Sequence, residues 1–302
     1  MSQPQSNSNE ADSFPAKVAE AIILKGLECT VTKQEAALFY RLKVFKLDGP
    51  VLEIALIDLQ TWKNPAAEHE YSRILEEVST KRANGKRITF LWQDQWERSP
   101  EIALSRINAV LGESVRIPGR LTRIARIDKK TTELFLSLNH LQGNVSSKYR
   151  YGLYLPVKYF RVLPADYEIA DPTIDLLVAV ATFSHVRIFE KDGKPYRSFE
   201  MIRFANLIDT TVVGGLNKLL AAFENDFKPD DIMTYADLEW SDGASYRKLG
   251  FEAITEKPPI SFWVDEYALI RYNNDDTQKE LTRITNAGSR KFVKVIKPEN
   301  WI

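Results

Sequence analysis

Two adjacent glycines between a strand pattern and a helix pattern constrain this chain more than any other short feature. Gly214 and Gly215 separate the β-branched run Thr210–Val213 from an amphipathic stretch that continues to Phe223. Glycine costs stability there unless the backbone turns sharply or something approaches it closely. Where a strand is followed directly by a helix, the free amide N–H groups of the first helical turn and the positive end of the helix dipole point at one spot. The pattern therefore predicts either an anion-binding turn or a tight packing contact.

The composition is that of an ordinary globular protein with two domains. The chain has 302 residues, 44% apolar and 27% charged, and its 41 basic residues balance its 41 acidic ones. With a net charge of zero the protein has no overall electrostatic attraction to nucleic acid or to an anionic membrane, so any basic surface must be a local patch. Cys29 is the only cysteine, which excludes an internal disulfide framework. The histidines His69, His140 and His185 lack the spacing of two ligands on one helix face, so we expect no metal site.

The N-terminus and the longest apolar run bear on where the protein is found. Residues 1–14 are polar and lack the basic start and apolar block of a secretory signal, so we expect a disordered tail. The longest apolar run, Ile174–Phe183, is too short to cross a bilayer. We therefore expect a cytoplasmic protein with no membrane partner.

Residues 15–112 show the pattern of a small α/β domain. A short helix over 16–26 precedes two strand patterns, 38–47 and 50–59, joined at Asp48-Gly49, a strong hairpin signal. A helix pattern over 66–85 ends in Asn-Gly, a strand follows, and a second helix opens with Ser-Pro and closes at Gly112. Residues 113–120 are predicted to be the linker that leaves this domain.

Residues 121–302 show a different order of elements. Strand and short-helix patterns come first, and after the glycine turn helices and strands alternate. This order predicts an α+β fold with a mixed, mostly antiparallel sheet and flanking helices rather than a doubly wound parallel sheet.

Several catalytic signatures are missing from the sequence. It has no GxxxxGK[ST] phosphate loop, no GxGxxG opening a βα unit, no GxSxG elbow and no HExxH. Common nucleotide hydrolysis, dinucleotide binding, serine hydrolysis and zinc proteolysis therefore lack support.

The segment after the glycine turn matches a known family pattern. A predicted strand ends near Ala236, a polar loop follows, and a helix pattern carries "SYRKLGF", with Tyr246 four residues before Gly250-Phe251. Together with "VVGGLNKLL", this resembles the second half of the GNAT (GCN5-related N-acyltransferase) superfamily. The resemblance implies a strand that splays from its neighbour, a glycine-containing turn that binds the pyrophosphate of acyl-CoA, and a tyrosine that protonates the leaving thiolate.

By this resemblance, Tyr246 is the general acid and acetyl-CoA is the first candidate among acyl-CoA cofactors. The pyrophosphate would face the turn and first helical residues, which are Val213, Gly214, Gly215, Asn217 and Lys218. Many family members carry Gln/Arg-x-x-Gly-x-Gly/Ala at this turn, and this chain has adjacent glycines instead. A second departure is an apparent insertion over 156–172, between two strands that usually join by a short turn.

A narrower resemblance covers roughly residues 88–294. The motifs "NHLQG", "YADLEWSDG" and "YRKLGF" are similar to the GNAT-like domain of phage and mobile-element proteins, where it follows a Vsr-like or homing-endonuclease-like domain. Mom-like DNA-modifying acyltransferases are relatives of that group, so the resemblance implies DNA or RNA as a partner and a nucleobase amine as the preferred acceptor.

Other polar residues near these motifs are candidates for the site. Asn139 and Gln142 would bind a substrate amide or base edge, and His140 would take a proton from an amine. These three side chains equally fit a helix C-terminus that caps its own carbonyls. Arg203, inside an apolar strand, is either an anion-binding group or the partner of a buried carboxylate such as Asp237.

The loop before the Tyr246 helix supplies the remaining candidates. Asp237 is a further catalytic candidate, and with Trp240 it would line a substrate cleft. Trp240 would also fit a buried position in the core.

The N-terminal domain can be tested against nuclease chemistry. A metal-dependent nuclease of the PD-(D/E)xK type needs an acidic residue and then Asp/Glu-x-Lys on the next strand. Glu53 and Asp58 are acidic, but their odd separation places them on opposite faces of a regular strand, and Lys63 does not complete the spacing. We interpret this domain as a degenerate nuclease relative.

The sequence thus favours an acyl-CoA-dependent N-acyltransferase acting on an amine. The alternatives are a catalytically inactive nucleic-acid-binding accessory protein and, with less support, a metal-dependent nuclease.

Overall fold

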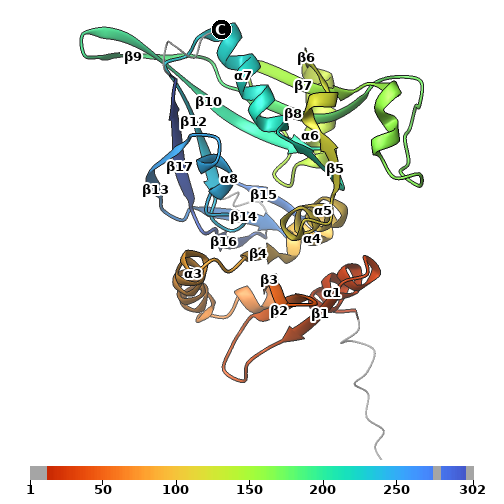
Figure 1. Ribbon diagram of the computed structural model, residues 1–302. Helices are drawn as coiled ribbons and strands as arrows, with labels where there is room; N and C mark the ends of the chain where they lie inside the picture. Colours follow the sequence, from red (N-terminus) through yellow and green to blue (C-terminus); the bar gives the residue numbers. More distant parts are fainter. Residues whose placement is uncertain (1–11, 275–279, 297–302) are drawn as a thin grey trace, which may run out of the picture. The chain divides into compact units, whose positions relative to one another are not determined.

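The computed structural model describes residues 12–274 and 280–296, and its chain divides into two compact units (Figure 1). Unit 1 comprises Met1–Leu104, Asp237–Asp242 and Lys257–Ser289, and unit 2 comprises Ser105–Ala236, Gly243–Glu256 and Arg290–Ile302. Each unit is described by itself. Within the described ranges, no helix is long and apolar enough to span a membrane. The tail expected over 1–14 lies outside the described residues up to position 11, and its last residue begins a helix.

Unit 1 contains a four-stranded sheet in the order β1-β2-β3-β4. The pairs β1–β2 and β2–β3 are antiparallel, β3–β4 is parallel, and Lys46 pairs with Gly49 across the hairpin predicted at Asp48-Gly49, which is confirmed. Its elements are α1 (Phe14–Leu24), β1 (Glu28–Thr32), β2 (Tyr40–Lys46), β3 (Gly49–Ile57), α2 (Leu59–Trp62), α3 (Ala67–Ala83), β4 (Ile88–Trp92) and α4 (Gln93–Arg98).

Late segments of the chain complete unit 1. The strands β14 (Ser261–Asp265), β15 (Ile270–Tyr272) and β16 (Thr282–Thr285) form an antiparallel sheet in the order β15-β14-β16. Val264 and Ile284 from this sheet are buried in one core cluster with Tyr71 and Trp92. Unit 1 is therefore assembled from three separate stretches of sequence.

Unit 2 is built on a mixed sheet in the order β13-β17-β12-β10-β8-β7-β6, with β9 added at one end of β10. The pairs β6–β7, β7–β8, β8–β10 and β9–β10 are antiparallel, and β10–β12 is parallel. The expected α+β class with a mostly antiparallel sheet is confirmed. The strands are β6 (Arg123–Arg126), β7 (Tyr149–Leu155), β8 (Leu176–Phe183), β9 (Arg187–Lys191), β10 (Lys194–Asn206), β12 (Asp231–Asp237), β13 (Glu252–Lys257) and β17 (Ser289–Val295).

Two helices cover opposite faces of this sheet. Alternate residues of a strand face opposite sides, and Val180 of β8 packs with Phe135 and Leu136 of α6 (Lys129–Asn139). Its neighbours Ala179 and Ala181 belong instead to the cluster that holds Phe223 of α7 (Gly215–Phe227). The remaining elements are α5 (Pro100–Leu111), β5 (Val115–Pro118), η1 (Gly119–Leu121), η2 (Val157–Val162), β11 (Thr210–Val213) and α8 (Ala244–Arg247).

Residues 113–120, expected as a linker, have a different structure. Val115–Pro118 form β5, which pairs in parallel with β11. The strand is four residues long and its partner is about a hundred residues away, so no local pattern reveals it. The division between the units also differs from the expected boundary at 112, because it falls after Leu104 and returns two later segments to unit 1.

The segment over 156–172 joins two neighbouring antiparallel strands, β7 and β8. It begins with the 3₁₀ helix η2, and Leu163, which follows η2, is 8% exposed. Tyr159 and Phe160 pack against the main core cluster of unit 2. The insertion is thus a packed element of that unit.

Candidate functional site

The two glycines at the start of α7 are required for different structural reasons. Gly214 has φ = 75°, in the left-handed region, and a Cβ added there would meet nothing within 4 Å. A Cβ on Gly215 would lie 2.8 Å from Cγ1 of Val212 and 3.1 Å from Cδ1 of Leu153. Gly215 therefore permits tight packing, whereas Gly214 sets the turn and faces open space.

The N-terminus of α7 has no side-chain cap. The first amides of a helix have no acceptor within it, so those that follow Gly214 point out of the helix end. Val213 is 43% exposed, and Gly214 and Asn217 are not buried either. Lys218 is engaged elsewhere, because its Nζ donates to the carbonyls of Gly119, at 3.1 Å, and Thr122. Burial lowers the pKa of Lys218.

Strands β10 and β12 of unit 2 separate after a short parallel contact. They pair only over three residues, from Ser198↔Asp231 to Glu200↔Met233. Beyond that point β10 continues along β8 as far as Asn206, with a bulge between Met201 and Arg203. We call this opening the β10–β12 fork. In the described chain, the main chains of the two strands do not pair with each other beyond Glu200.

Tyr246 lies at the fork. Its hydroxyl is hydrogen-bonded to that of Thr234 on β12, and Thr234 Oγ1 donates to the carbonyl oxygen of Met201 on β10 at 3.0 Å. The ring packs against Phe251 and Phe292, with centroids 5.7 and 5.5 Å away. Burial raises the pKa of Tyr246, and the Thr234 hydrogen bond and the charge of Arg106 oppose that rise. Tyr246 is therefore a protonated phenol at neutral pH.

The three polar residues at the end of α6 are largely committed to local contacts. Asn139 donates to the carbonyl of Phe135 at 2.8 Å and accepts the N–H of Ile208 at 2.6 Å. Nδ1 of His140 accepts the N–H of Gln142 at 3.2 Å, so a neutral His140 carries its proton on Nε2 and can donate from it. This geometry favours a hydrogen-bond donor over the proton acceptor that was expected. The Gln142 residue is partly exposed.

Two arginines give the region around His140 a positive potential. Burial and the charges of Arg203 and Arg106 lower the pKa of His140 to about 3, so the imidazole is neutral. Arg203 donates to the carbonyls of Gly143, at 3.3 Å, and Ile202, at 3.1 Å. Arg106 acts on both His140 and Tyr246. A developing negative charge near these groups would be stabilised.

Asp237, the last residue of β12, and Trp240 belong to the segment Asp237–Asp242 of unit 1. Asp237 Oδ1 accepts the N–H of Glu239 at 3.0 Å, and Trp240 is 4% exposed, as expected for the alternative of a core position.

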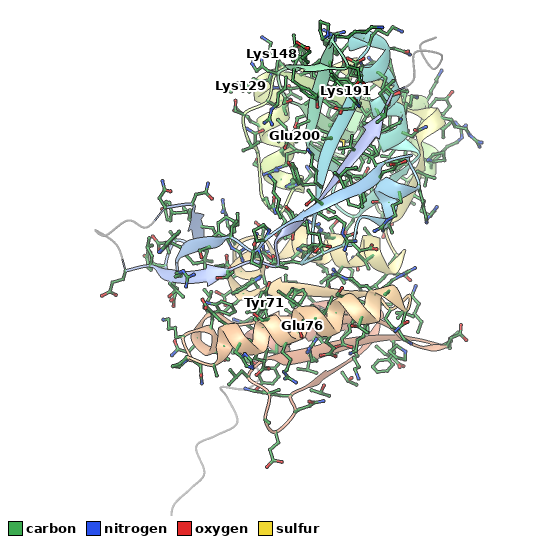
Figure 2. All side chains as sticks on the ribbon, turned by 90° about the vertical axis from the view of Figure 1, so that its left-hand side faces the viewer. Tyr71, Glu76, Lys129, Lys148, Lys191 and Glu200 are labelled. Atoms are coloured by element: carbon green, nitrogen blue, oxygen red, sulfur yellow. The ribbon has the colours of Figure 1, made fainter. Side chains whose placement is uncertain are left out.

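Glu239, in the same segment, is a buried carboxylate with a raised pKa. It is 2% exposed, and its Oε1 accepts from Trp92 Nε1 at 2.7 Å and from the Tyr71 hydroxyl at 2.9 Å. Burial, followed by the nearby charge of Asp237, raises its pKa to about 7, against the opposing charge of Arg271 and the two hydrogen bonds. Figure 2 labels Tyr71 on α3. Glu239 is a buried structural carboxylate of unit 1.

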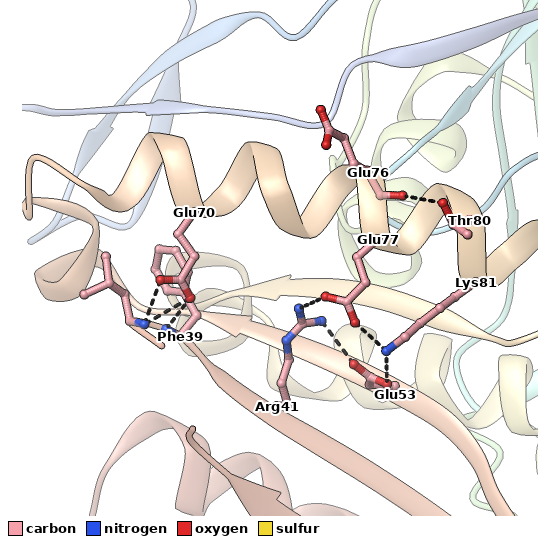
Figure 3. Close-up of polar contacts among 9 residues, drawn as sticks. Phe39, Arg41, Glu53, Glu70, Glu76, Glu77, Thr80 and Lys81 are labelled. Carbon is pink, nitrogen blue, oxygen red and sulfur yellow. Dashed lines mark hydrogen bonds and ion pairs between the residues drawn. The ribbon is translucent and has the colours of Figure 1, made fainter. Parts of the chain in front are cut away.

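The acidic residues weighed for a nuclease are used in other contacts. Glu53 forms ion pairs with Arg41 at 3.1 Å and Lys81 at 3.2 Å, and both cations also contact Glu77 (Figure 3). Asp58 caps α2 by accepting the N–H of Thr61 at 2.6 Å. Within residues 12–274 and 280–296, no group of three or more His, Cys, Asp or Glu side chains is arranged to hold a metal ion.

Sequence reasoning missed three contributors to these sites. Arg106 and Thr234 approach the fork from α5 and β12, and no motif marks them. Glu239 stands beside Trp240 in the sequence, but its hydrogen-bond partners Trp92 and Tyr71 are more than 140 residues away, so no local pattern indicates them.

Comparisons with known proteins give no family assignment. No family model matches the chain, and no curated protein matches it. Among solved structures, an Arabidopsis thaliana NAA60 in complex with a bisubstrate analogue is 9% identical with a TM-score of 0.35, covering 58% of this chain and 99% of that chain. The NatC complex bound to Gag peptide and CoA is 13% identical with a TM-score of 0.32, and it covers the same shares.

The ribosomal-protein-S18-alanine N-acetyltransferase from Escherichia coli is 10% identical with a TM-score of 0.32, covering 60% of this chain and 99% of that chain.

Proposed function

We propose that unit 2 is a GNAT-like domain that binds an acyl-CoA, with acetyl-CoA as the first candidate, and transfers the acyl group to an amine. The observation that carries the proposal is the position of Tyr246, whose hydroxyl is bonded to Thr234 where β10 and β12 part. The family resemblance requires a splayed strand pair and a tyrosine on the following helix, and the parallel contact of only three residues supports the first of these.

The glycine turn is the proposed pyrophosphate seat. Its support is the uncapped N-terminus of α7, the exposure of Val213 and the open space beside Gly214. Phosphate oxygens are favoured there by the first amides of the helix and by the helix dipole. Lys218 contributes by holding the η1 segment through the carbonyl of Gly119 rather than by pairing with phosphate.

The chemistry assigned to this chain is an acid-assisted transfer. The free amine attacks the thioester carbonyl directly and loses its proton to water, and the tetrahedral intermediate collapses by expelling the CoA sulfur. Tyr246 protonates that sulfur and then takes a proton back from water, and a phenol with a raised pKa is suited to this because it keeps its proton at neutral pH. Arg106, whose charge acts on Tyr246, supplies positive potential for the negative charge that develops.

The acceptor is the finer part of the proposal. The resemblance to phage and mobile-element proteins suggests a nucleobase amine as the acceptor of the acyl group. The same resemblance suggests that the protein acts in a phage or mobile element. The nuclease alternative loses support because Glu53 and Asp58 are engaged in an ion-pair network and a helix cap.

The test is a calorimetric titration of the full chain with acetyl-CoA and with desulfo-CoA. A matched pair of variants addresses the turn, because Asn and Asp both tolerate the left-handed backbone and differ in charge. We expect Gly214→Asp to weaken binding at least about tenfold through repulsion of phosphate, and Gly214→Asn to stay within about threefold of wild type.

Circular dichroism and thermal melting establish that both variants are folded. Folded wild-type protein that binds neither ligand would overturn the proposal. Equal binding of acetyl-CoA by the two variants would show that the glycine turn does not bind the pyrophosphate.

A further inference from the structure

A two-stranded ribbon in unit 2 is the feature that the proposed function does not use. It consists of β9 and the first residues of β10, which pair from Lys191↔Lys194 to Arg187↔Ser198. Its two-residue loop has φ = 51° at Asp192 and 72° at Gly193, as a type I′ turn requires. In the described chain β10 meets β12 only from Ser198 and β8 only from Met201, so the ribbon extends past its neighbours in unit 2 (Figure 1).

The two faces of this ribbon have different chemistry. Residues that pair directly share a face, and so do alternate residues of each strand. One face therefore carries three cations and two aromatic rings with no carboxylate among them, and we call it the basic–aromatic face. Its members are Arg187, Phe189, Lys191, Lys194, Tyr196 and Ser198. The opposite face carries Ile188, Glu190, Pro195 and Arg197.

The contacts on the basic–aromatic face hold the rings in place while leaving Phe189 accessible. Phe189 and Tyr196 have ring centroids 5.0 Å apart, and Lys191 Nζ lies 4.6 Å from the Tyr196 ring. Phe189 is 49% exposed. Tyr196 is anchored by a hydrogen bond to Asp231. Two further acidic groups lie next to this face: Asp230, whose charge acts on Tyr196, and Glu200, whose Oε2 lies 3.8 Å from Nη2 of Arg187 at the base of the ribbon. Figure 2 labels Glu200 and Lys191.

We propose that the basic–aromatic face binds single-stranded nucleic acid, with its cations along the phosphates and Phe189 stacked on a base. Sequence-tolerant binding of single strands combines a row of cations with exposed aromatic rings, and both occur here on one face. The chain as a whole is neutral, so the gathering of three cations on one face of the ribbon is not a consequence of composition. The carboxylates beside them lie at the base of the ribbon, where Glu200 pairs with Arg187 and Asp230 and Asp231 act on Tyr196. An acidic peptide would use the cations but would leave the exposed ring without a role.

The ribbon and the fork share strand β10. Tyr196 and Arg203 are seven residues apart, about 23 Å along an extended strand. A single strand of nucleic acid bound on the ribbon can therefore extend toward the fork. Binding itself does not require acyl transfer, so this proposal stands without the proposed function.

The experiment is fluorescence anisotropy of the full chain with labelled oligothymidylate and oligouridylate of about 12 nucleotides, a length within the usual site sizes. Phe189→Ala is the test variant, and Ile188→Ala, on the opposite face and 64% exposed, is the matched control. We expect Phe189→Ala to raise Kd at least about fivefold and the control to change it less than about twofold.

A double variant, Lys191→Gln with Lys194→Gln, tests the cations. Removing two phosphate contacts reduces the slope of log K against log salt by about 1.4. Unaltered oligonucleotide binding by Phe189→Ala, or none by wild type, would overturn the proposal. A labelled polyglutamate of equal charge that binds as tightly would overturn it in favour of an acidic protein partner. Desulfo-CoA binding, measured on the same variants, is expected to stay unchanged, which separates this outcome from that of the proposed function.

Discussion

Tyr71 in unit 1 and Tyr246 in unit 2 both have a pKa raised by burial, but their hydroxyls have partners of different chemistry. Tyr71 donates to the carboxylate of Glu239, which when ionised accepts only and therefore penalises a phenolate. Tyr246 is hydrogen-bonded to the Thr234 hydroxyl, which donates its own proton to the Met201 carbonyl while it accepts from the phenol, and which can rotate that proton toward a phenolate. The difference teaches that burial alone does not mark a catalytic tyrosine. A partner that suits both protonation states is compatible with proton transfer, whereas a carboxylate partner indicates a structural role.

The largest effect is expected where the structural tyrosine loses its partner. Glu239→Leu leaves the Trp92 N–H and the Tyr71 hydroxyl buried without their present acceptor, so we expect the free energy of unfolding to fall by about 2–5 kcal/mol. Urea denaturation measures it. Glu68→Ala, which removes an exposed pair with Arg283, is the control and should cost less than about 1 kcal/mol. Equal losses in the two variants would contradict the structural role of Glu239.

The next effect concerns the proposed catalytic tyrosine. Tyr246→Phe removes the proton donor and keeps the ring packing against Phe251 and Phe292, so we expect kcat to fall about 100-fold or more with little change in stability. The measurement is release of CoA thiol from acetyl-CoA with a panel of nucleosides, peptides and polyamines. Tyr71→Phe is the matched variant and should reverse the pattern, with lost stability and retained kcat. A Tyr246→Phe variant with the kcat of the wild type would show that Tyr246 is not the general acid.

The pH dependence of stability distinguishes the two environments further. Glu239 has a folded pKa of about 7, above the ordinary value of 4.5, so between these pH values the folded state binds more protons than the unfolded state. The free energy of unfolding then decreases as pH rises through this window, by up to about 1.4 kcal/mol per unit, and is constant with respect to this group above it. Glu239→Gln should lack this contribution. A wild-type minus variant difference that is flat between pH 4.5 and 7 would contradict the assignment.

The smallest effect tests the partner of Tyr246. Thr234→Val keeps the shape of the side chain and removes the hydroxyl that opposes the rise in the pKa of Tyr246. We expect the ultraviolet titration midpoint of Tyr246 to move upward by about one unit or less, and stability to fall by about 1 kcal/mol. A downward shift would show that Thr234 does not stabilise the phenolate. The Tyr246→Phe protein identifies which phenol is observed.

Sequence patterns predicted the parts of the fold that depend on neighbouring residues. The hairpin at Asp48-Gly49, the helix that begins at Gly215 and the mixed, mostly antiparallel character of the sheet in unit 2 follow from turn chemistry and periodicity. The Asp192-Gly193 turn carries the same signal as Asp48-Gly49, yet its hairpin is not predicted, because the exposed strands around it show no apolar alternation. The parallel β5–β11 pair is too short and too distant in sequence to leave a pattern.

The candidate site is predictable only in part. Tyr246 and the glycine turn stand in motifs, so their residue types and spacing are enough to indicate them. Asn139 and His140 are candidates by residue type, but their contacts depend on Ile208 and Gln142, which residue type does not reveal. Thr234 and Arg106 come from other elements and meet Tyr246 only in the folded chain.

The assembly of unit 1 from three stretches has a consequence for synthesis on the ribosome. Trp92 precedes its acceptor Glu239 by 147 residues, and β16 is made later still. At about 5–20 residues per second, the indole N–H and the neighbouring aromatic side chains wait about 7–30 seconds for that carboxylate. During this interval the nascent N-terminal segment exposes apolar surface that β14 and β16 later cover, so we expect it to need protection from aggregation until nearly the whole chain has been translated.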